Sequence, residues 1–465
     1  MNVFGVEMWE RFSFYGMQGI LLLFFVATVA EGGLDIDKGT AAGIVGAYGG
    51  AVYLSTIVGA WIADRLLSAE RTLFASAVVI MFGHIALALM PGAAGVVIGL
   101  VLVAVGSGGL KANATSVVGT LYREGDKRRE AGFSLFYLGI NLGGFAGPLV
   151  TGFLNDTVGF HWGFGSAAIG MGIGLVQYAL GRRTLPESAR TVPNPLPRSK
   201  YAMWIGIAVV GIAAIVALVL TGVITVSNLS AVVIVVVIIA AVAYFTVILS
   251  SRSITSTERS RVFAFIPLFI ASVAFWSLYQ QQFTIVELYA DDRTNRSIFG
   301  WEMPTPWILS INPVFIILLS GVFAAMWMRM GKRQPSTPVK FAMGTIVMGA
   351  AFLLFLPFAG GHGNTTPVLF LTLILLVFTI AELMLSPVGL SVTTVLAPKA
   401  FRSQMVALWF LSSSLGTAMS GWLVGFYDEQ NEAPYFLILG VIAIVIGLGV
   451  WAGAKPIVKL MRGAA

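Results

Sequence analysis

Apolar stretches of about 20 residues recur along the whole chain, and short polar loops separate them. A helix of about 20 residues crosses the hydrocarbon core of a bilayer, which is about 30 Å thick. We therefore expect about fourteen membrane spans, because that is how often the pattern repeats. Their expected ranges are 3–30, 41–64, 71–91, 95–121, 132–155, 160–181, 201–223, 226–250, 261–288, 307–331, 339–358, 367–396, 404–426 and 433–454.

The order of these spans predicts the domain organisation. Six spans are followed by a polar, proline-bearing loop, then two plain apolar spans, then six more. The pattern predicts an all-α polytopic membrane protein with two six-helix bundles, at 1–181 and 261–465. The segment 182–260 would join them as a linker with two extra transmembrane helices.

The composition of the chain excludes several other classes of protein. Charged residues make up 11% of the chain, less than half of the share of about 25% in soluble domains. Cysteine is absent, so disulfides and thiolate chemistry are excluded. The sequence contains no recognisable metal-ligand cluster, nucleophile motif or phosphate loop, and only three histidines. We expect neither an enzyme nor a bound cofactor or metal.

The net charge of +7 is explained by membrane topology. If the N-terminus is cytoplasmic, nearly all Lys and Arg residues of the loops fall on the cytoplasmic side. Lys38, Arg293 and Arg296 are the exceptions. This asymmetry follows the positive-inside rule. It predicts a multi-pass protein of the cell membrane, in contact with lipid, with both termini cytoplasmic and no role for nucleic acid. A monomer is the default expectation.

Five ionisable residues are expected inside the spans: Glu7, Glu10, Arg11, Lys111 and Glu382. The other acids are assigned to loops. A charge at bilayer depth costs about 2.5–3.5 kcal/mol on insertion scales, so such residues usually have a function. Glu7, Glu10 and Arg11 lie three and four residues apart, and therefore share one helix face. Fully ionised, the five would carry one net negative charge.

That charge suggests a proton site. Burial and like-charged neighbours favour the protonated form of a carboxylate, so one of the three acids should take up a proton. Glu7 and Glu10 are the better candidates because each has an acidic neighbour, whereas Glu382 would suit a substrate ammonium group. The alternative is a buried ion-pair network that only holds helices together.

The first of these segments also carries a resemblance. Glu7-Met-Trp-Glu10-Arg11-Phe12-Ser-Phe14-Tyr15-Gly16 resembles the E-x-x-E-R-F-x-Y-Y-G motif of the proton-dependent oligopeptide transporter family, within the major facilitator superfamily. Further matches cover nearly the whole chain, at Leu110-Lys111-Ala112-Asn113, Tyr137-Leu-Gly-Ile-Asn141, Phe275-Trp276, Ser310-Ile-Asn312-Pro313, Glu382-Leu-Met-Leu-Ser386-Pro387 and Trp409-Phe410.

The resemblance implies a function and a site. It implies a proton-coupled symporter that imports di- and tripeptides by alternating access. Proton coupling would involve Glu7, Glu10, Arg11, Lys111 and Glu382. The peptide carboxylate would meet Arg11 and Lys111, and its amino group would meet Asn141, Asn312 and Glu382. The remaining positions of the implied substrate pocket are Tyr15, Tyr53, Trp276, Gln280, Ser386 and Trp409.

Two departures from the family pattern leave alternatives open. Gln18 and Gln280 stand where relatives often have an arginine and a glutamate, and we expect an amide–amide contact in place of an ion pair. The same scaffold could carry nitrate, a drug or a peptide-like molecule instead. A channel or a membrane-embedded enzyme is the alternative from another class. His84 is expected to be a structural histidine with satisfied ring nitrogens.

Overall fold

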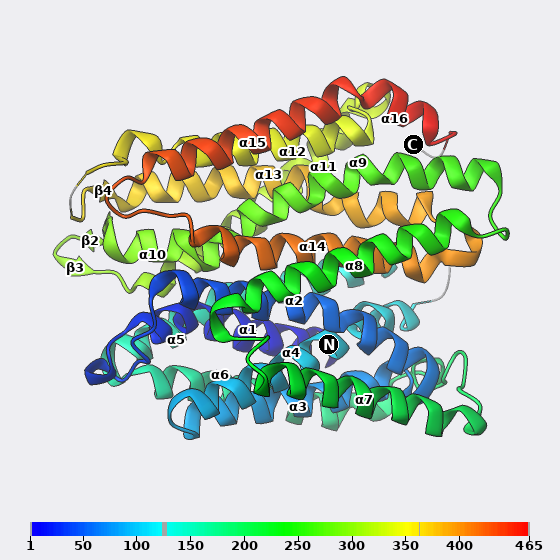
Figure 1. The fold of residues 1–465 in the computed structure, drawn as a ribbon, viewed down its shortest axis with the longest axis horizontal. Helices are drawn as coiled ribbons and strands as arrows, with labels where there is room; N and C mark the ends of the chain where they lie inside the picture. The colour runs from blue at the N-terminus through cyan, green and yellow to red at the C-terminus, as the bar shows by residue number, and fades with distance from the viewer. Residues whose placement is uncertain (1, 123–127, 362, 464–465) are drawn as a thin grey trace.

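The chain was analysed as a computed structural model, in which residues 2–122, 128–361 and 363–463 are described, and these residues are almost entirely helical (Figure 1). The first part holds six long helices that alternate in direction. They are α1 Asn2–Val26, α2 Lys38–Ile62, α3 Ala69–Leu89, α4 Gly92–Thr120, α5 Arg128–Val158 and α6 Phe160–Gly181. A short 3-10 turn, η1 Val29–Glu31, follows α1, and a π-helical turn, η2 Ala63–Leu67, extends α2.

The hairpin and the second part follow in the expected order. The hairpin consists of α7 Tyr201–Leu220 and α8 Leu229–Ser250. The second part contains α9 Ser256–Tyr279, η7 Gln280–Phe283, α10 Ile285–Asp292, η8 Thr305–Ser310, α11 Ile311–Met330, α12 Thr337–Leu353, α13 Val368–Leu396, α14 Arg402–Val424, α15 Ala433–Ala452 and α16 Ala454–Leu460. Two small sheets lie in its loops. β1 Thr294–Asn295 pairs in parallel with β4 Thr366–Pro367, and β2 Ser297–Ile298 pairs antiparallel with β3 Trp301–Glu302.

The helices are long and apolar enough to cross a membrane. Twelve segments of the described chain meet that description, and they include both helices of the hairpin. Two further helices have similar lengths. These are α1, with 25 residues and three charges, and α14, with 23 residues and a run of serines. The twelve segments and these two helices make up the fourteen expected spans.

The ninth span, expected at 261–288, differs from the expectation of one continuous helix. α9 ends at Tyr279, the chain continues as a 3-10 turn through Gln280–Phe283, and Thr284 leaves helical geometry with φ −133° and ψ −101° before α10 begins. No proline or glycine marks this break. The side chain of Gln281 holds it from both sides, since its amide donates to Ser277 O at 3.2 Å and its oxygen accepts from Tyr435 at 2.7 Å.

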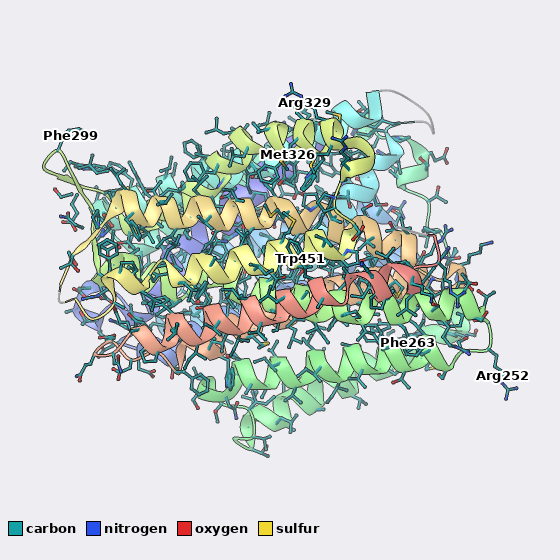
Figure 2. The ribbon with its side chains drawn as sticks, turned by 90° about the horizontal axis from the view of Figure 1, so that it is seen from above. Arg252, Phe263, Phe299, Met326, Arg329 and Trp451 are labelled. Carbon is teal, nitrogen blue, oxygen red and sulfur yellow. The ribbon has the colours of Figure 1, made fainter. Side chains whose placement is uncertain are left out.

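The two faces of the molecule are marked by their loops. Figure 2 shows Phe299 at one end of the helices, with Arg252 and Arg329 toward the other end. We call the end with Phe299 the outer face, because the positive-inside rule predicts that it is extracellular.

The two halves of the chain meet closely in the outer half. A Cβ at Gly46 of α2 would lie 2.7 Å from the Cα of Gly421 on α14, so glycine permits this approach. Ser414 Oγ donates to the carbonyl of Gly50 at 2.7 Å. A second contact joins η8 to α5, where Trp307 Nε1 donates to Leu149 O at 3.0 Å. The two halves therefore meet in the outer half at two places, one by close approach of their backbones and one by a side-chain hydrogen bond.

Candidate functional site

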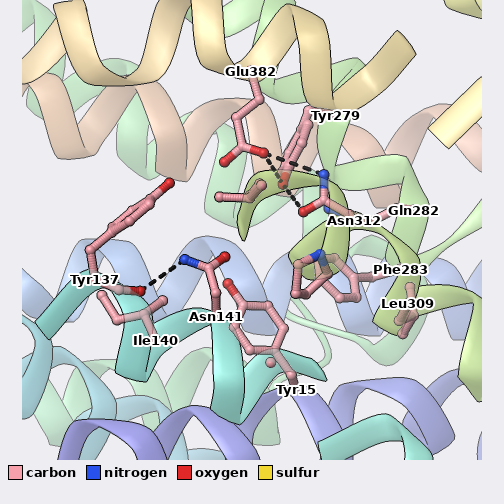
Figure 3. A pocket seen from close by; sticks show the side chains of 13 residues that line it. Tyr15, Tyr137, Ile140, Asn141, Tyr279, Gln282, Phe283, Leu309, Asn312 and Glu382 are labelled. Atoms are coloured by element: carbon pink, nitrogen blue, oxygen red, sulfur yellow. Dashed lines mark hydrogen bonds between the residues drawn. The ribbon is translucent and has the colours of Figure 1, made fainter. Parts of the chain in front are cut away.

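A cavity lies between the two halves, inward of the outer contacts (Figure 3). Its volume is about 80 Å³, which is below the range of about 300–1,000 Å³ that is usual for small-molecule sites. Its walls come from α1, α5, α9, η7, η8, α11 and α13. The lining residues are Tyr15, Tyr137, Ile140, Asn141, Gly144, Tyr279, Gln282, Phe283, Leu309, Asn312, Pro313, Ile316 and Glu382.

Glu382 on α13 is the carboxylate of this cavity. Its Oε2 accepts a hydrogen bond from the hydroxyl of Tyr279 at 2.8 Å and one from Asn312 Nδ2 at 3.4 Å. Asn312 Nδ2 also donates to Thr379 Oγ1 at 3.0 Å. Glu382 takes part in none of the ion pairs found among the described residues. Neutral donors orient the carboxylate, and a cationic ligand could still pair with it.

The opposite wall comes from α1 and α5. Asn141 Nδ2 donates to the carbonyl of Tyr137, one turn earlier, at 2.9 Å. Figure 3 shows Asn141 and the ring of Tyr15 on the side of the cavity opposite Glu382. Tyr15 stacks on Phe283 of η7, with ring centroids 6.0 Å apart and planes 26° apart. The cavity thus has one acidic wall and one amide and phenol wall, joined by aromatic rings.

The charged cluster of α1 is compact and buried. Arg11 Nε lies 3.1 Å from Glu7 Oε1 and 2.7 Å from Glu10 Oε2, and all three side chains are almost inaccessible to solvent. Ser107 Oγ on α4 donates to Glu10 Oε1 at 3.3 Å. Arg11 Nη2 and Glu7 Oε2 have no hydrogen-bond partner in the described part of the chain. Both acids depend on one guanidinium group, so any displacement of Arg11 affects both of them.

Lys111 on α4 lies beside this cluster without joining its ion pairs. Its ammonium is 4.2 Å from the centroid of the Tyr53 ring and 5.3 Å from that of Phe14. Phe14 in turn contacts Tyr15, with centroids 5.5 Å apart. The ammonium group of Lys111 is therefore held by two aromatic rings. No acid among the described residues accepts a hydrogen bond from it.

The five ionisable residues do not form one cluster. Glu7, Glu10, Arg11 and Lys111 belong to α1 and α4, and their formal charges cancel, whereas Glu382 stands alone on α13. The expected net charge of −1 is located on Glu382. Two acids that were assigned to loops are buried within spans: Glu70 on α3, which pairs with Arg182, and Glu287. Glu287 on α10 is 1% exposed and lies within a span.

The other expected pocket residues lie around the cavity without lining it. Trp276 packs edge-on against Tyr279, at 5.3 Å, and its indole nitrogen has no partner in the described chain. Trp409 is buried against Gly389 and the ring of Phe341. Ser386 is half-buried one turn beyond Glu382 on α13. Gln280 is buried, within reach of a hydrogen bond to the side chain of Tyr53.

Nine lining residues were not assigned to the site from the sequence, and four of these are polar or aromatic: Tyr137, Tyr279, Gln282 and Phe283. Tyr137 precedes Asn141 by one helical turn, and this spacing could have identified it. Tyr279 could have been found as a polar-tipped aromatic residue inside an apolar span. Gln282 and Phe283 reach the cavity only because the ninth span unwinds between α9 and α10, which the sequence does not signal.

Two expectations about neutral side chains are wrong. Gln18 Oε1 is buried with no hydrogen-bond partner among the described residues, so it accepts no bond from Gln280. Gln280 instead lies within reach of the side chain of Tyr53. His84 on α3 is fully buried, and neither ring nitrogen has a partner in the described chain. The histidine is packed in an apolar environment without the expected hydrogen bonds.

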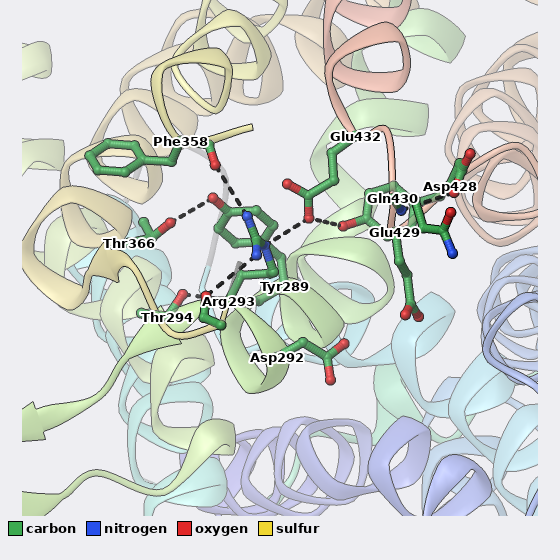
Figure 4. Close-up of polar contacts among 12 residues, drawn as sticks. Tyr289, Asp292, Arg293, Thr294, Phe358, Thr366, Asp428, Glu429, Gln430 and Glu432 are labelled. Atoms are coloured by element: carbon green, nitrogen blue, oxygen red, sulfur yellow. Dashed lines mark hydrogen bonds and ion pairs between the residues drawn. The ribbon is translucent and has the colours of Figure 1, made fainter. Parts of the chain in front are cut away.

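Charged side chains also organise the outer face. Arg293 Nε lies 3.0 Å from Glu432 Oε1, which also accepts from the Tyr427 hydroxyl at 2.6 Å (Figure 4). Lys38 lies 2.7 Å from both Asp292 and Glu429. Since Lys38 belongs to α2 and both acids belong to the second part, these ion pairs connect the two halves. We call Lys38, Asp292 and Glu429 the outer lock.

Comparison with known proteins identifies the family. The model of the POT family matches residues 70–445. The chain is 44% identical over 466 residues to "Uncharacterized transporter YclF" of Bacillus subtilis, covering 99% of this chain and 94% of that protein. It is 39% identical over 475 residues to a di-/tripeptide transporter of Lactococcus lactis subsp. cremoris, covering 99% and 96%. The chain belongs to the POT family.

Solved structures agree with this assignment. A crystal structure of a peptide transporter POT in complex with sulfate matches with a TM-score of 0.95 and 43% identity, over 99% of this chain and 95% of that one. A POT family transporter in complex with 5-aminolevulinic acid matches with a TM-score of 0.93 and 38% identity, over 98% and 96%. The fold is that of a multi-pass membrane transporter, as the sequence predicted.

Proposed function

We propose that this protein is a proton-coupled symporter that imports di- and tripeptides by alternating access. The observation that carries the proposal is the asymmetry of charge across the cavity. Glu382 is an unpaired carboxylate on one wall, while Arg11 and Lys111 lie behind the opposite wall. A zwitterionic peptide, with one positive and one negative end, matches this arrangement.

The amino terminus of the peptide would bind at Glu382. An ammonium group donates three hydrogen bonds, and Glu382 with the amide oxygens of Asn312 and Asn141 could accept them. Tyr279 would adjust its hydroxyl, which now donates to both Glu382 and Asn312. The aromatic rings of Tyr15 and Phe283 offer an apolar surface for side chains of different chemistry.

The carboxylate of the peptide would bind toward Lys111 and Arg11. Lys111 has donors that no described acid uses, and it approaches the cavity through its contact with Phe14, next to Tyr15. Arg11 has a free Nη2. If a peptide carboxylate drew the guanidinium away from Glu7 and Glu10, one of these buried acids would lose its counter-charge.

This competition would couple the proton to the peptide. A buried acid without a cation is strongly disfavoured in its charged form. Glu7 or Glu10 would therefore take up a proton when Arg11 turns to the substrate, and would release it when Arg11 returns. The coupling sites remain Glu7, Glu10 and Arg11, with Lys111 and Glu382 setting the charge of the cavity.

Alternating access would proceed around this site. The outer half is closed by α2 against α14 and by η8 against α5, so the structure corresponds to a state closed toward the outer face. We propose that the outer face is extracellular, with both termini cytoplasmic in the cell membrane, and that one chain in a lipid bilayer suffices for transport.

Uptake by reconstituted liposomes tests the proposal. Labelled dialanine should enter with an inward proton gradient, and unlabelled tripeptides should compete while nitrate and free alanine do not. Glu382→Gln should reduce peptide uptake. A second candidate, another small amino-carboxylate solute, is favoured by the relative solved with 5-aminolevulinic acid. Competition by 5-aminolevulinic acid and none by tripeptides would favour it.

A further inference from the structure

Glu287 is a buried acid that the proposed transport mechanism does not use. It lies in the first turn of α10, beyond the break that separates α9 from α10, and it is 1% exposed. Neither of its carboxylate oxygens has a hydrogen-bond partner in the described part of the chain, and it joins none of the ion pairs found there. Its neighbours Ile285, Val286 and Leu288 are equally buried.

Among the described residues, no positively charged group forms an ion pair with Glu287. The nearest charged group along α10 is Asp291, one turn later, which has its own partners in Arg296 and Thr305. α10 packs against α1, η7, η8 and β1. Of these, η7, η8 and β1 carry no charged residue. The ionisable groups on α1 are Glu7, Glu10, Arg11 and Tyr15, and the α10 helix itself adds Tyr289, Asp291 and Asp292.

An ionised Glu287 would therefore be an uncompensated buried charge in this state. The N-terminal end of a helix favours a nearby anion, but that effect is small compared with the desolvation of a carboxylate. A neutral carboxyl group removes the penalty. The same helix also ends at Asp292, which pairs with Lys38 of the other half. Glu287 and the lock residue Asp292 thus belong to one eight-residue helix, so a movement of this helix would affect both.

We propose that Glu287 is a second proton-binding site, which must accept a proton before the outer face can close. When the outer face opens, water reaches the carboxylate and the proton returns to the medium on that side. One proton converts the carboxylate to a neutral carboxyl group, and no other bond changes. This gate proton does not cross the membrane, so it sets how transport depends on external pH and leaves the proton-to-peptide ratio unchanged.

The inference rests on the proposed alternating access but can fail separately from proton-coupled symport. The chain has no cysteine, so spin labels at Val29→Cys and Phe299→Cys would report the opening of the outer face without further changes. Both positions are highly exposed. We expect the fraction of long distances to grow as pH rises. Glu287→Gln should stay closed at every pH, and Glu287→Asp should regain the pH dependence.

Matched variants keep the test decisive. Glu302→Gln removes an exposed acid of the outer face and should behave as the unchanged protein. If Glu287→Gln folds poorly, Glu287→Met suits the apolar surroundings and should also remain closed. Infrared spectra of the closed state should show a protonated carboxyl band that Glu287→Gln lacks. A wild-type pH dependence in Glu287→Gln and Glu287→Met, or no such band, would overturn the inference. If the unchanged protein showed no peptide uptake driven by a proton gradient, that result would instead refute symport.

Discussion

The ammonium group of Lys38, at the first residue of α2, lies 2.7 Å from the carboxylate of Asp292, at the last residue of α10. These residues are 254 positions apart and belong to opposite halves of the transporter. Glu429 lies at the same distance from the ammonium group. The outer lock is therefore a single cation held between two acids, one on each of two segments of the second half.

Removing this cation should open the outer face. The side chains are partly exposed, and such pairs are worth about 0–1 kcal/mol each. Lys38→Gln should therefore raise the ratio of outward-open to closed molecules by about fivefold, measured by the distance between labels at Val29 and Phe299. Lys38→Arg keeps the charge and should change the ratio little. If Lys38→Gln and Lys38→Arg gave the same distribution of label-to-label distances, the outer lock would have no role in closure.

The glycine contact between α2 and α14 should matter more than the ion pairs. A Cβ at position 46 would lie 2.7 Å from the Cα of Gly421, which is a backbone atom that cannot move aside. Gly46→Ala should block closure and reduce uptake by at least tenfold, which corresponds to about 1.4 kcal/mol. Gly206→Ala on the hairpin is the matched control, because its Cβ meets nothing within 4 Å. If Gly46→Ala took up peptide as well as the unchanged protein, α2 and α14 would be able to move apart easily at this contact.

The acidic wall predicts how a substrate amine is recognised. Glu382→Gln should weaken binding of dialanine by about tenfold or more, since a hydrogen bond to a charged group is worth about 1.5–3 kcal/mol. N-acetyl-dialanine has no ammonium group, so Glu382→Gln and the unchanged protein should bind it equally well. Calorimetry in detergent would compare the two ligands. If Glu382→Gln still prefers the free amine, another group recognises it.

Arg11 should be essential for stability as well as for transport. Arg11→Gln leaves Glu7 and Glu10 without their shared cation, and breaking such buried pairs costs about 3–5 kcal/mol. The variant should unfold at a lower temperature in detergent. Adding Glu10→Gln to it should restore part of the loss, because one unpaired acid is removed. A double variant less stable than Arg11→Gln alone would contradict this charge balance.

Much of the fold could be predicted because the bilayer dictates it. Helices such as α6, found at Phe160–Gly181 and expected at 160–181, follow from the length of apolar sequence that crosses a membrane. The buried positions of Glu7, Glu10 and Arg11 on one helix face follow from helical periodicity. These properties depend on residues near one another in the sequence.

The features that could not be predicted depend on distant parts of the chain. The break after Tyr279 lacks proline and glycine, and it is held by Tyr435 through Gln281. The assignment of Glu287 to a loop failed because it lies near the end of its span, where burial is decided by packing between helices. The predicted Gln18–Gln280 contact failed, and Gln280 lies within reach of the side chain of Tyr53 instead.

Proton movement driven by peptide alone tests the central claim most directly. Liposomes holding the protein and a pH-sensitive dye would start with equal pH inside and outside, and with membrane potential clamped by potassium and valinomycin. Adding dialanine outside should acidify the interior, and the change should be absent with Glu7→Gln/Glu10→Gln. Entry of labelled dialanine with no change in internal pH would contradict the account, because the peptide would then cross without a proton.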